Sequence, residues 1–255
     1  MRTLLLILLL TAQTWAEHQH LSGAGTNDAL DQLSFSQTQR WDSALLKRAQ
    51  QTPRLLPRDW QKSVAVPHPP ANTSERTRAE LQTLKTLIAE RPQAEARIQS
   101  EVTLTNFPFG QHTYAALIDS SKRPATAKLV EATFNDTAIA IFIFKKQFNR
   151  VRPSLLADKL KAPIGTAIPV PEHPAYPSGH AASAWAISYL LQELDPDSTE
   201  QYHQSATAIA HHREIAGLHY PSDSDAGRLL ARQILDLLLA NPHFQKQLKE
   251  AKKEW

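Results

Sequence analysis

The chain contains no cysteine in its 255 residues. This absence excludes thiol nucleophiles, disulfide bonds and cysteine metal sites, and it leaves no residue for a lipoprotein anchor. A chain of this length can form a sizeable hydrophobic core without such cross-links, so a single domain is the expected organisation.

Long apolar runs are missing as well. The runs Leu4 to Leu10 and Ala138 to Phe144 fall well short of the ~20 residues that span a bilayer. The first run follows Arg2 and gives way to a more polar stretch that ends at Ala16. This pattern predicts a cleaved signal peptide over residues 1–16, and the short run disfavours the alternative of a membrane anchor. We therefore expect a periplasmic or secreted protein with no stable membrane insertion.

The sequence also lacks a cluster of lysines and arginines of the kind that follows a nucleic-acid backbone, and its formal charge is only +3. No nucleic-acid partner is therefore expected. Glycine is scarce, with 7 residues, and few segments alternate polar and apolar residues as strands do. The sequence predicts an all-α fold, a single-domain helical bundle.

Helical periodicity and breakers divide the chain into segments. Proline-rich residues 52–72 are expected to form a linker or an extended arm, and residues 153–177, which hold several further prolines, a loop. We expect the longest helix, 127–151, to stop at Arg152-Pro153, because a proline disfavours a helical conformation in the residue before it. The expected helices are pieces of 27–51, then 74–90, 92–102, 127–151, 180–194, 199–216 and a last helix from about Ser222.

Caps and apolar faces can be assigned to two of these helices. Ser74 is the expected N-cap of 74–90, and Ser222 with Asp225 is expected to cap the last helix as a box. The apolar residues of the first face are Leu81, Leu84, Leu87 and Ile88, and those of the second are Ala226, Leu229, Leu230, Ile234, Leu237 and Leu238.

Lys145 and Arg152 form the first candidate functional segment. Their separation of seven residues is close to two helical turns, so both are expected on one helix face, about 10 Å apart. Two long cationic side chains on one face can reach a single anion. The alternative is a solvated basic face, which the nearby Lys146 and Arg150 favour.

The turn from Pro177 to His180 is the second segment, and a good helix follows it. Gly179 allows close approach of a ligand to the backbone, and unpaired N–H groups at a helix N-terminus favour phosphate. Ser178 adds a hydroxyl, and His180 is placed to give a proton to a leaving oxygen. An ordinary turn with a capping serine is the alternative.

Arg213, His219 and Asp223 are the third segment. The four-residue spacing of His219 and Asp223 suits a carboxylate that accepts from one imidazole nitrogen and leaves the other as a nucleophile. Gly217 and Pro221 indicate a break that can turn Arg213 and His219 toward one point. A surface histidine beside a capping aspartate is the alternative.

Together the three segments contain the groups that phosphoryl transfer through a histidine requires: cations, backbone donors, a nucleophile and an acid. Cationic side chains can carry the charge of the phosphate, so no metal or other cofactor is expected. His203, His211 and His212 do not form a tetrahedral ligand set with a carboxylate.

These motifs resemble those of the type-2 phosphatidic acid phosphatase superfamily, which includes the vanadium haloperoxidases. Its pattern is K-x6-R-P, then P-S-G-H, then S-R-x5-H-x3-D, and the chain reproduces all three internal spacings. The chain is most similar to bacterial class A non-specific acid phosphatases, because of the signal peptide, the chain length and the tail from Asn241 to Leu248. The resemblance covers residues 69–255 as one domain, and residues 17–68 would be a partly helical N-terminal arm.

The resemblance implies a helical bundle and a role for each motif residue. His219 would be the nucleophile and Asp223 its orienting partner, while His180 would protonate the leaving group and later activate water. The residues implied to hold the phosphate are Lys145, Arg152, Ser178, Gly179 and Arg213. The implied activity is that of an acid phosphatase acting on small phosphorylated substrates at mildly acid pH, and vanadate would bind as a phosphate mimic.

The chain departs from the family pattern at three positions. His212 replaces the usual serine before Arg213, Ala181 replaces a common threonine, and His173 precedes His180 by seven residues. In haloperoxidases an extra histidine near vanadate tunes peroxide chemistry, so a vanadate-dependent haloperoxidase is the first alternative. We expect His173 to be a loop residue near the pocket mouth. A non-catalytic phosphate-binding protein is the second alternative, and the physiological substrate and any homo-oligomer stay open.

Overall fold

The computed structural model describes residues 28–102 and 120–255, so the predicted signal peptide lies outside the described residues. Helices and irregular segments make up these ranges, and no strand occurs in them, which confirms the predicted all-α class. The α-helices are α1 (Asp28–Asp31), α2 (Ser43–Arg48), α3 (Glu75–Leu87), α4 (Arg91–Ser100), α5 (Pro124–Phe148), α6 (Pro153–Lys159), α7 (Gly179–Leu194), α8 (Thr199–Ile215), α9 (Pro221–Ala240) and α10 (Pro242–Ala251).

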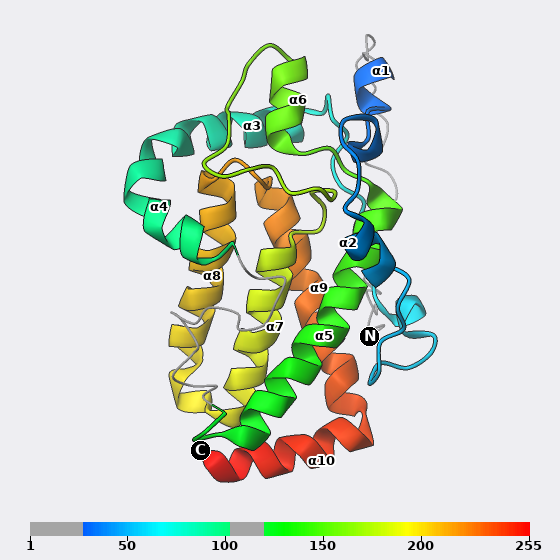
Figure 1. Ribbon diagram of the computed structural model, residues 1–255, viewed down its shortest axis with the longest axis vertical. Helices are drawn as coiled ribbons and strands as arrows, with labels where there is room; N and C mark the ends of the chain where they lie inside the picture. The colour runs from blue at the N-terminus through cyan, green and yellow to red at the C-terminus, as the bar shows by residue number, and fades with distance from the viewer. Residues whose placement is uncertain (1–27, 103–119) are drawn as a thin grey trace, which may run out of the picture.

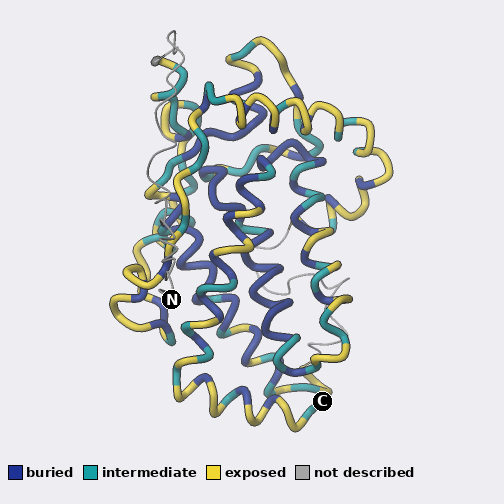
Figure 2. Tube along the Cα trace, turned by 180° about the vertical axis from the view of Figure 1, so that it is seen from behind, coloured by how far each residue is buried: buried dark blue, intermediate teal, exposed yellow. Residues whose placement is uncertain are grey.

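Four long helices, α5, α7, α8 and α9, form a bundle in which α7 packs against each of the other three (Figure 1). The helix α10 crosses one end of the bundle, and α3, α4 and α6 lie at the other end. Dark-blue buried segments run along the bundle helices, whereas the outer segments carry most of the exposed residues (Figure 2). The end capped by α3, α4 and α6 receives the loops that carry the three predicted motifs.

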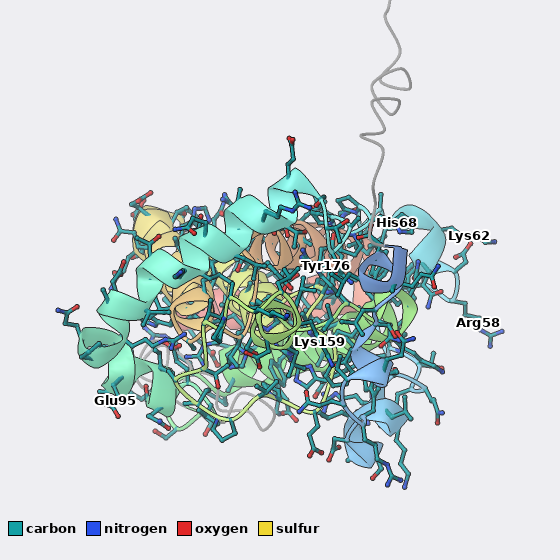
Figure 3. All side chains as sticks on the ribbon, turned by 90° about the horizontal axis from the view of Figure 1, so that it is seen from above. Arg58, Lys62, His68, Glu95, Lys159 and Tyr176 are labelled. Carbon is teal, nitrogen blue, oxygen red and sulfur yellow. The ribbon has the colours of Figure 1, made fainter. Side chains whose placement is uncertain are left out.

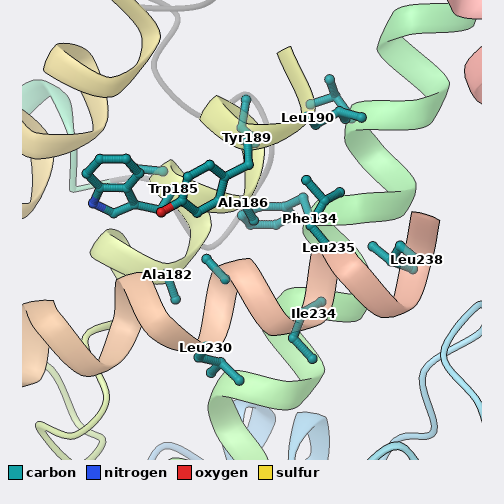
Figure 4. Packing of buried hydrophobic residues seen from close by; sticks show 14 of the residues in the cluster. Phe134, Ala182, Trp185, Ala186, Tyr189, Leu190, Leu230, Ile234, Leu235 and Leu238 are labelled. Carbon is teal, nitrogen blue, oxygen red and sulfur yellow. The ribbon is translucent and has the colours of Figure 1, made fainter. Parts of the chain in front are cut away.

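Small residues allow α7 to sit at the centre. Ala182 and Ala186 are completely buried, and Figure 4 shows them within the cluster that also holds Phe134 of α5 and Leu230 and Ile234 of α9. A Cβ atom added at Gly227 of α9 would lie 2.7 Å from the carbonyl oxygen of Ser178. The closest approach of α7 and α9 therefore falls beside the predicted phosphate-binding turn.

The proline-rich segment 52–72 is an extended arm rather than a linker. Leu56, Trp60 and Val64 are buried in the same hydrophobic core as α5 and α7. The carboxylate of Asp136 on α5 accepts from the backbone N–H groups of residues 54–56 at 2.7 to 3.2 Å. Seen from above, the exposed Arg58 and Lys62 project at the edge of the molecule (Figure 3).

The first helical predictions hold. Ser74 caps α3 by accepting from the backbone N–H of Thr77 at 3.2 Å, and α4 begins at the residue before Pro92. Among the predicted apolar residues of α3, Leu84 is completely buried. The helices α7 and α8 start and end within a residue of the predicted bounds.

The end of α5 was predicted wrongly. The helix ends at Phe148, because Asn149 adopts a left-handed conformation with φ of 49° and caps it. Pro153 then starts α6, where its missing N–H costs nothing, so the predicted loop 153–177 begins with a helix. Arg152 therefore does not share a helix face with Lys145; the turn at Asn149 brings it back toward the bundle.

Two predictions about the last helix also need correction. The carboxylate of Asp223, and not that of Asp225, caps α9 by accepting from the backbone N–H of Tyr220 at 3.0 Å. The side chain of Asp225 is 76% exposed beside Arg76. Leu229, placed on the apolar face, is 41% exposed. The chain also forms a further helix, α10, because the Asn241 side chain accepts from the N–H groups of His243 and Phe244.

None of the helices within 28–102 and 120–255 combines the length and the apolar character that crossing a bilayer requires.

The close approach of Gly227 to α7 leads to a prediction about stability. Alanine normally stabilises a helix interior relative to glycine by about 1 kcal/mol. Gly227→Ala should instead lower the free energy of unfolding by about 1–3 kcal/mol, because its Cβ would meet backbone atoms of Ser178 and Ala182 at 2.7 and 2.9 Å. Urea denaturation measures the change. Leu229→Ala, at an exposed site on the same helix, is the control and should change stability little; a stabilised Gly227→Ala variant would contradict the packing.

Candidate active site

The turn before α7 is attached to the start of α9. The Ser178 backbone N–H donates to the carbonyl oxygen of Asp223 at 2.9 Å. Its hydroxyl accepts from the backbone N–H of Ala181 at 3.3 Å, so Ser178 is the N-cap of α7. Gly179 has no side chain, and a Cβ there would contact Ile141 and Lys145 of α5. The predicted phosphate-binding turn thus lies between α5 and α9.

His219 and Asp223 form the predicted pair. The His219 Nδ1 atom is 3.1 Å from Asp223 Oδ2, and both side chains are buried. A carboxylate can only accept, so Nδ1 carries the proton in this contact. Nε2 lies 3.1 Å from Arg152 Nη1, which can only donate. The two contacts together fix a neutral imidazole with the lone pair on Nε2, the form that a nucleophile needs.

Arg150 supports Asp223 from the other side, and the sequence analysis missed this role. The Arg150 Nη1 atom donates to Asp223 Oδ1 at 2.6 Å, and its guanidinium lies 3.8 Å from the centre of the Tyr220 ring. Glu80 from α3 approaches Arg150 at 3.5 Å and accepts from Ser222. Arg150 is therefore a buried structural cation and does not belong to a solvated basic face. No local signal separates Arg150 from Arg152, because residues two apart in an extended segment are expected on the same side.

Arg152 and Lys145 are fully buried and are held by backbone carbonyls. Arg152 donates from Nη1 to the carbonyl oxygen of Leu218 at 2.8 Å and from Nε to that of His173 at 3.0 Å. The Lys145 Nζ atom donates to the carbonyl oxygens of Pro174 and Ala175 at 2.7 and 3.0 Å. Carbonyls satisfy hydrogen bonds but do not neutralise charge, so both cations can still attract an anion.

Arg213 has one occupied edge and one open edge. Its Nη2 atom donates to Glu101 Oε2 at 2.7 Å and to the carbonyl oxygen of Ile98 at 3.1 Å. Its Nε and Nη1 atoms are buried and have no hydrogen-bond partner among the described residues. Unpartnered buried donors of this kind require a ligand or water. The Arg213 guanidinium is thus fixed on one side, and its two free N–H groups are oriented to bind an oxyanion.

Glu101 is the second residue that the sequence analysis missed. Its carboxylate binds Arg213 and also lies 2.8 Å from Nδ1 of His212, the residue that replaces the usual serine. Its carbonyl oxygen lies 2.9 Å from His180 Nε2. A carbonyl can only accept, so Nε2 carries a proton and Nδ1 is the His180 nitrogen left to exchange one. No motif spacing in the sequence points to Glu101, because α4 reaches the site only through the tertiary fold.

His173 does more than the sequence suggested. It lies in the predicted loop and lines a pocket, as expected for a residue near the pocket mouth. Its Nδ1 atom is also 3.0 Å from Arg152 Nη2, and its ring meets Phe142 edge-on, with ring centres 5.5 Å apart. His203 and His211 lie elsewhere, His203 against Trp185 and His211 beside Glu90 and Glu214.

Burial and mutual repulsion lower the pKa values of the clustered bases. Desolvation, followed by Arg152 and Lys145, holds the pKa of His219 well below its usual value. Desolvation, then Arg213, does the same to the pKa of His180. Desolvation also lowers the pKa of Lys145 well below normal and that of Arg152 to about 10. The site therefore carries an excess of positive charge in a low-dielectric environment, and a bound anion would neutralise this charge.

Fold and site together define an all-α protein with a buried cation cluster around a histidine–aspartate pair. Residues 126–245, a little under half of the chain, match the family model described as the PAP2 superfamily. Within 28–102 and 120–255, no three His, Asp or Glu side chains are grouped as metal ligands would be.

The chain is similar to curated acid phosphatases. It is 30% identical over 139 residues to a non-specific acid phosphatase of Providencia stuartii, covering 54% of this chain and 56% of that protein. It is 26% identical over 137 residues to an acid phosphatase of Zymomonas mobilis, covering 54% and 52%. The chain therefore spans about half the length of the curated relatives that it matches.

Solved structures of two vanadium enzymes have a similar fold. A bacterial vanadium-dependent iodoperoxidase matches with a TM-score of 0.56 and 17% identity, over 80% of this chain and 61% of the other. A holo-type bacterial vanadium-dependent chloroperoxidase matches with a TM-score of 0.60 and 16% identity, over 83% and 56%. At these identities the similarity shows the fold alone.

The lowered histidine pKa values predict a pH dependence of stability. His173, His180 and His219 have folded-state pKa values below the ordinary value of 6.5. Below that pH the unfolded chain binds protons that the folded chain does not, so stability falls as pH decreases. Each histidine contributes at most about 1.4 kcal/mol per pH unit. The thermal midpoint of unfolding should drop between pH 7.5 and 5.5, and inorganic phosphate should reduce the drop.

The variant His173→Asn has one such base fewer, so its thermal midpoint should fall less steeply with decreasing pH. A thermal midpoint of the wild type that does not change with pH would contradict the buried neutral histidines.

The contacts of Glu101 give a further prediction. Glu101→Gln should lower the free energy of unfolding by about 3 kcal/mol, because it leaves Arg213 as an uncompensated buried charge. Inorganic phosphate should restore part of the loss by neutralising Arg213, as chemical denaturation with and without phosphate would show. Glu95→Gln, at an exposed position on α4, the helix that ends at the cap residue Glu101 (Figure 3), is the matched control. Equal effects of the two substitutions would disprove the role of Glu101.

Proposed function

We propose that this protein is an acid phosphatase that hydrolyses small phosphomonoesters through a phosphohistidine intermediate. The observation that carries the proposal is the environment of His219 Nε2. Asp223 fixes the tautomer that leaves this atom a lone pair, and the buried cations Arg152, Lys145 and Arg213 act on it together. The similarity to curated proteins named acid phosphatases supports the proposed phosphatase activity.

In the first step His219 Nε2 attacks the phosphorus atom, and the bond between phosphorus and the leaving oxygen breaks. His180 gives a proton to that oxygen, so the alcohol leaves neutral. Asp223 keeps its hydrogen bond to Nδ1 and stabilises the positive charge that develops on the imidazole. Arg152, Lys145 and the open edge of Arg213 neutralise the phosphoryl oxygens, together with Ser178 and the Gly179 N–H at the N-terminus of α7.

In the second step a water molecule replaces the alcohol. Neutral His180 accepts a proton from the water, whose oxygen forms a bond to phosphorus while the bond to His219 Nε2 breaks. Inorganic phosphate leaves, and both histidines return to their starting protonation states. The free protein keeps His180 neutral, because its pKa is lowered. The charge of a bound phosphate ester offsets that effect, and lower pH favours the acid form, so activity is highest at mildly acid pH.

The cations supply the charge neutralisation, so the proposed reaction uses no metal or other cofactor. The sequence pattern of residues 1–16 supports export to the periplasm or medium, and this location belongs to the proposal.

Halide oxidation with bound vanadate is the second candidate. The contact of His173 with Arg152 favours it, since this histidine lies at the same cation cluster. The two candidates differ in what vanadate does. In a phosphatase, vanadate competes with substrate and inhibits, whereas in a haloperoxidase it is required for activity with peroxide.

Replacement of the nucleophile tests the proposal. His219→Ala should reduce the hydrolysis of an aryl phosphate in chelator by at least about a thousandfold, because the covalent step is lost. A folded variant should keep the far-ultraviolet circular dichroism of the wild type. His203→Ala, which removes a histidine packed on Trp185 away from the cluster, is the control and should keep full activity.

Rapid acid-free quenching of the wild type should also trap a phosphoprotein that His219→Ala does not form. Unchanged turnover in His219→Ala, or loss of wild-type activity in chelator, would refute the mechanism. Bromination that needs vanadate, in a protein without phosphatase activity, would replace it with the second candidate.

A further inference from the structure

A half-open pocket adjoins the cation cluster. The helix α5 forms one wall, and its residues Phe134, Ala138, Ile141 and Phe142 recur at helical spacing along a stripe that ends at Lys145. Leu45 from α2 adds a further apolar wall. Arg48 and Ser183 are the polar wall residues outside the cluster. The Arg48 Nη2 atom donates to Asn135 at 3.1 Å, and its buried Nε atom has no hydrogen-bond partner among the described residues. The pocket is therefore mainly apolar next to a strongly polar site.

The pocket lies on the side of the acid. His180, Gly179, His173 and Lys145 line it, whereas His219 is not among the described residues that do. In an in-line displacement the nucleophile and the leaving group stand on opposite sides of phosphorus. Because the nucleophile is His219 and the acid is His180, a space that is lined by the acid but not by the nucleophile is where the leaving alcohol would lie.

We propose that this pocket receives the alcohol of the phosphomonoester and selects aromatic or short aliphatic alcohols over polyols. The inference rests on the proposed function and adds the substrate class. Polyol hydroxyls that lie against such a wall lose their hydrogen bonds to water and find few partners in the pocket. An apolar alcohol gains from burial in the same place.

The size of the pocket sets the length of the apolar part. Its enclosed volume is about 60 Å³, less than half of the roughly 150 Å³ of a cavity that holds benzene. The pocket thus encloses the carbon atoms closest to the phosphate oxygen, and the rest of a larger alcohol extends through the open mouth. Selection acts on the first few carbons of the alcohol.

Two esters of primary alcohols test the selection. Benzyl phosphate and glycerol 1-phosphate have leaving groups of similar basicity, so a difference in kcat/KM reports the pocket rather than chemical reactivity. The wild type should prefer benzyl phosphate by about tenfold or more, the usual scale for discrimination by an apolar pocket. The inhibition constant of inorganic phosphate, which lacks an alcohol, serves as the readout of the cation cluster alone.

Two substitutions change the wall in different ways. Ala138→Leu fills the pocket, and Leu45→Gln makes its wall polar with little change of volume. Each should lower kcat/KM for benzyl phosphate by about tenfold and leave the inhibition constant of phosphate within about twofold. The matched controls are Ala132→Leu on α5 and Leu46→Gln on α2, which are partly buried but do not line the pocket. Both should keep the wild-type preference.

The outcomes separate this inference from the proposed function. Hydrolysis of both esters at equal kcat/KM, or equal losses for both in Leu45→Gln, would overturn the substrate class while the phosphatase assignment stands. Hydrolysis of neither ester by the wild type would overturn the proposed function and this inference with it. A Leu45→Gln variant that loses phosphate inhibition would also count against the pocket as a site for the alcohol alone.

Discussion

The carboxylate of Asp223 is the interaction on which the rest of the site depends. One oxygen binds His219 and caps α9 through the N–H of Tyr220, and the other binds Arg150. The backbone carbonyl of the same residue accepts from Ser178 and so fixes the start of α7. A single residue thereby joins two bundle helices, the histidine and a buried counter-charge. Neither the position of the turn nor the tautomer of His219 can change without breaking one of these bonds.

The second constraint is electrostatic. Burial of Lys145, Arg152 and Arg213 is costly, because each loses the solvation of a full charge. Carbonyls hold Lys145 and Arg152, and a single carboxylate, that of Glu101, reaches Arg213. The excess positive charge depresses the pKa values of the neighbouring histidines and keeps them neutral. The same excess favours the approach of an anion, so the cost in stability and the attraction of an anion have one physical origin.

The sequence predicted the fold better than the turns between its helices. Periodicity identified α3, α4, α7 and α8, whose faces follow from local spacing. Periodicity placed the end of α5 wrongly, because the left-handed cap depends on the single residue Asn149, and Pro153, four residues later, is the stronger stop signal in the sequence. The capping of α9 was assigned to Asp225 for a similar reason: two acids of the first turn had suitable spacing. Only the contacts of Asp223 with His219 and Arg150 distinguish between them.

By itself, the sequence determined the helical class and the eight residues, from Lys145 to Asp223, that meet at the site, because their spacings are local and each segment carries its own signal. The tertiary structure decided which charges surround them. It turned Arg152 inward and set Arg150 behind Asp223, and it brought Glu80 from α3 and Glu101 from α4 to the cations. It also placed the apolar stripe of α5 beside His180. These charged and polar partners are 70 to 142 residues apart in the chain, from Glu80 with Arg150 to Glu80 with Ser222. No local pattern encodes such pairings, which depend on the packing of α3 and α4 against α8 and of α5 against α7.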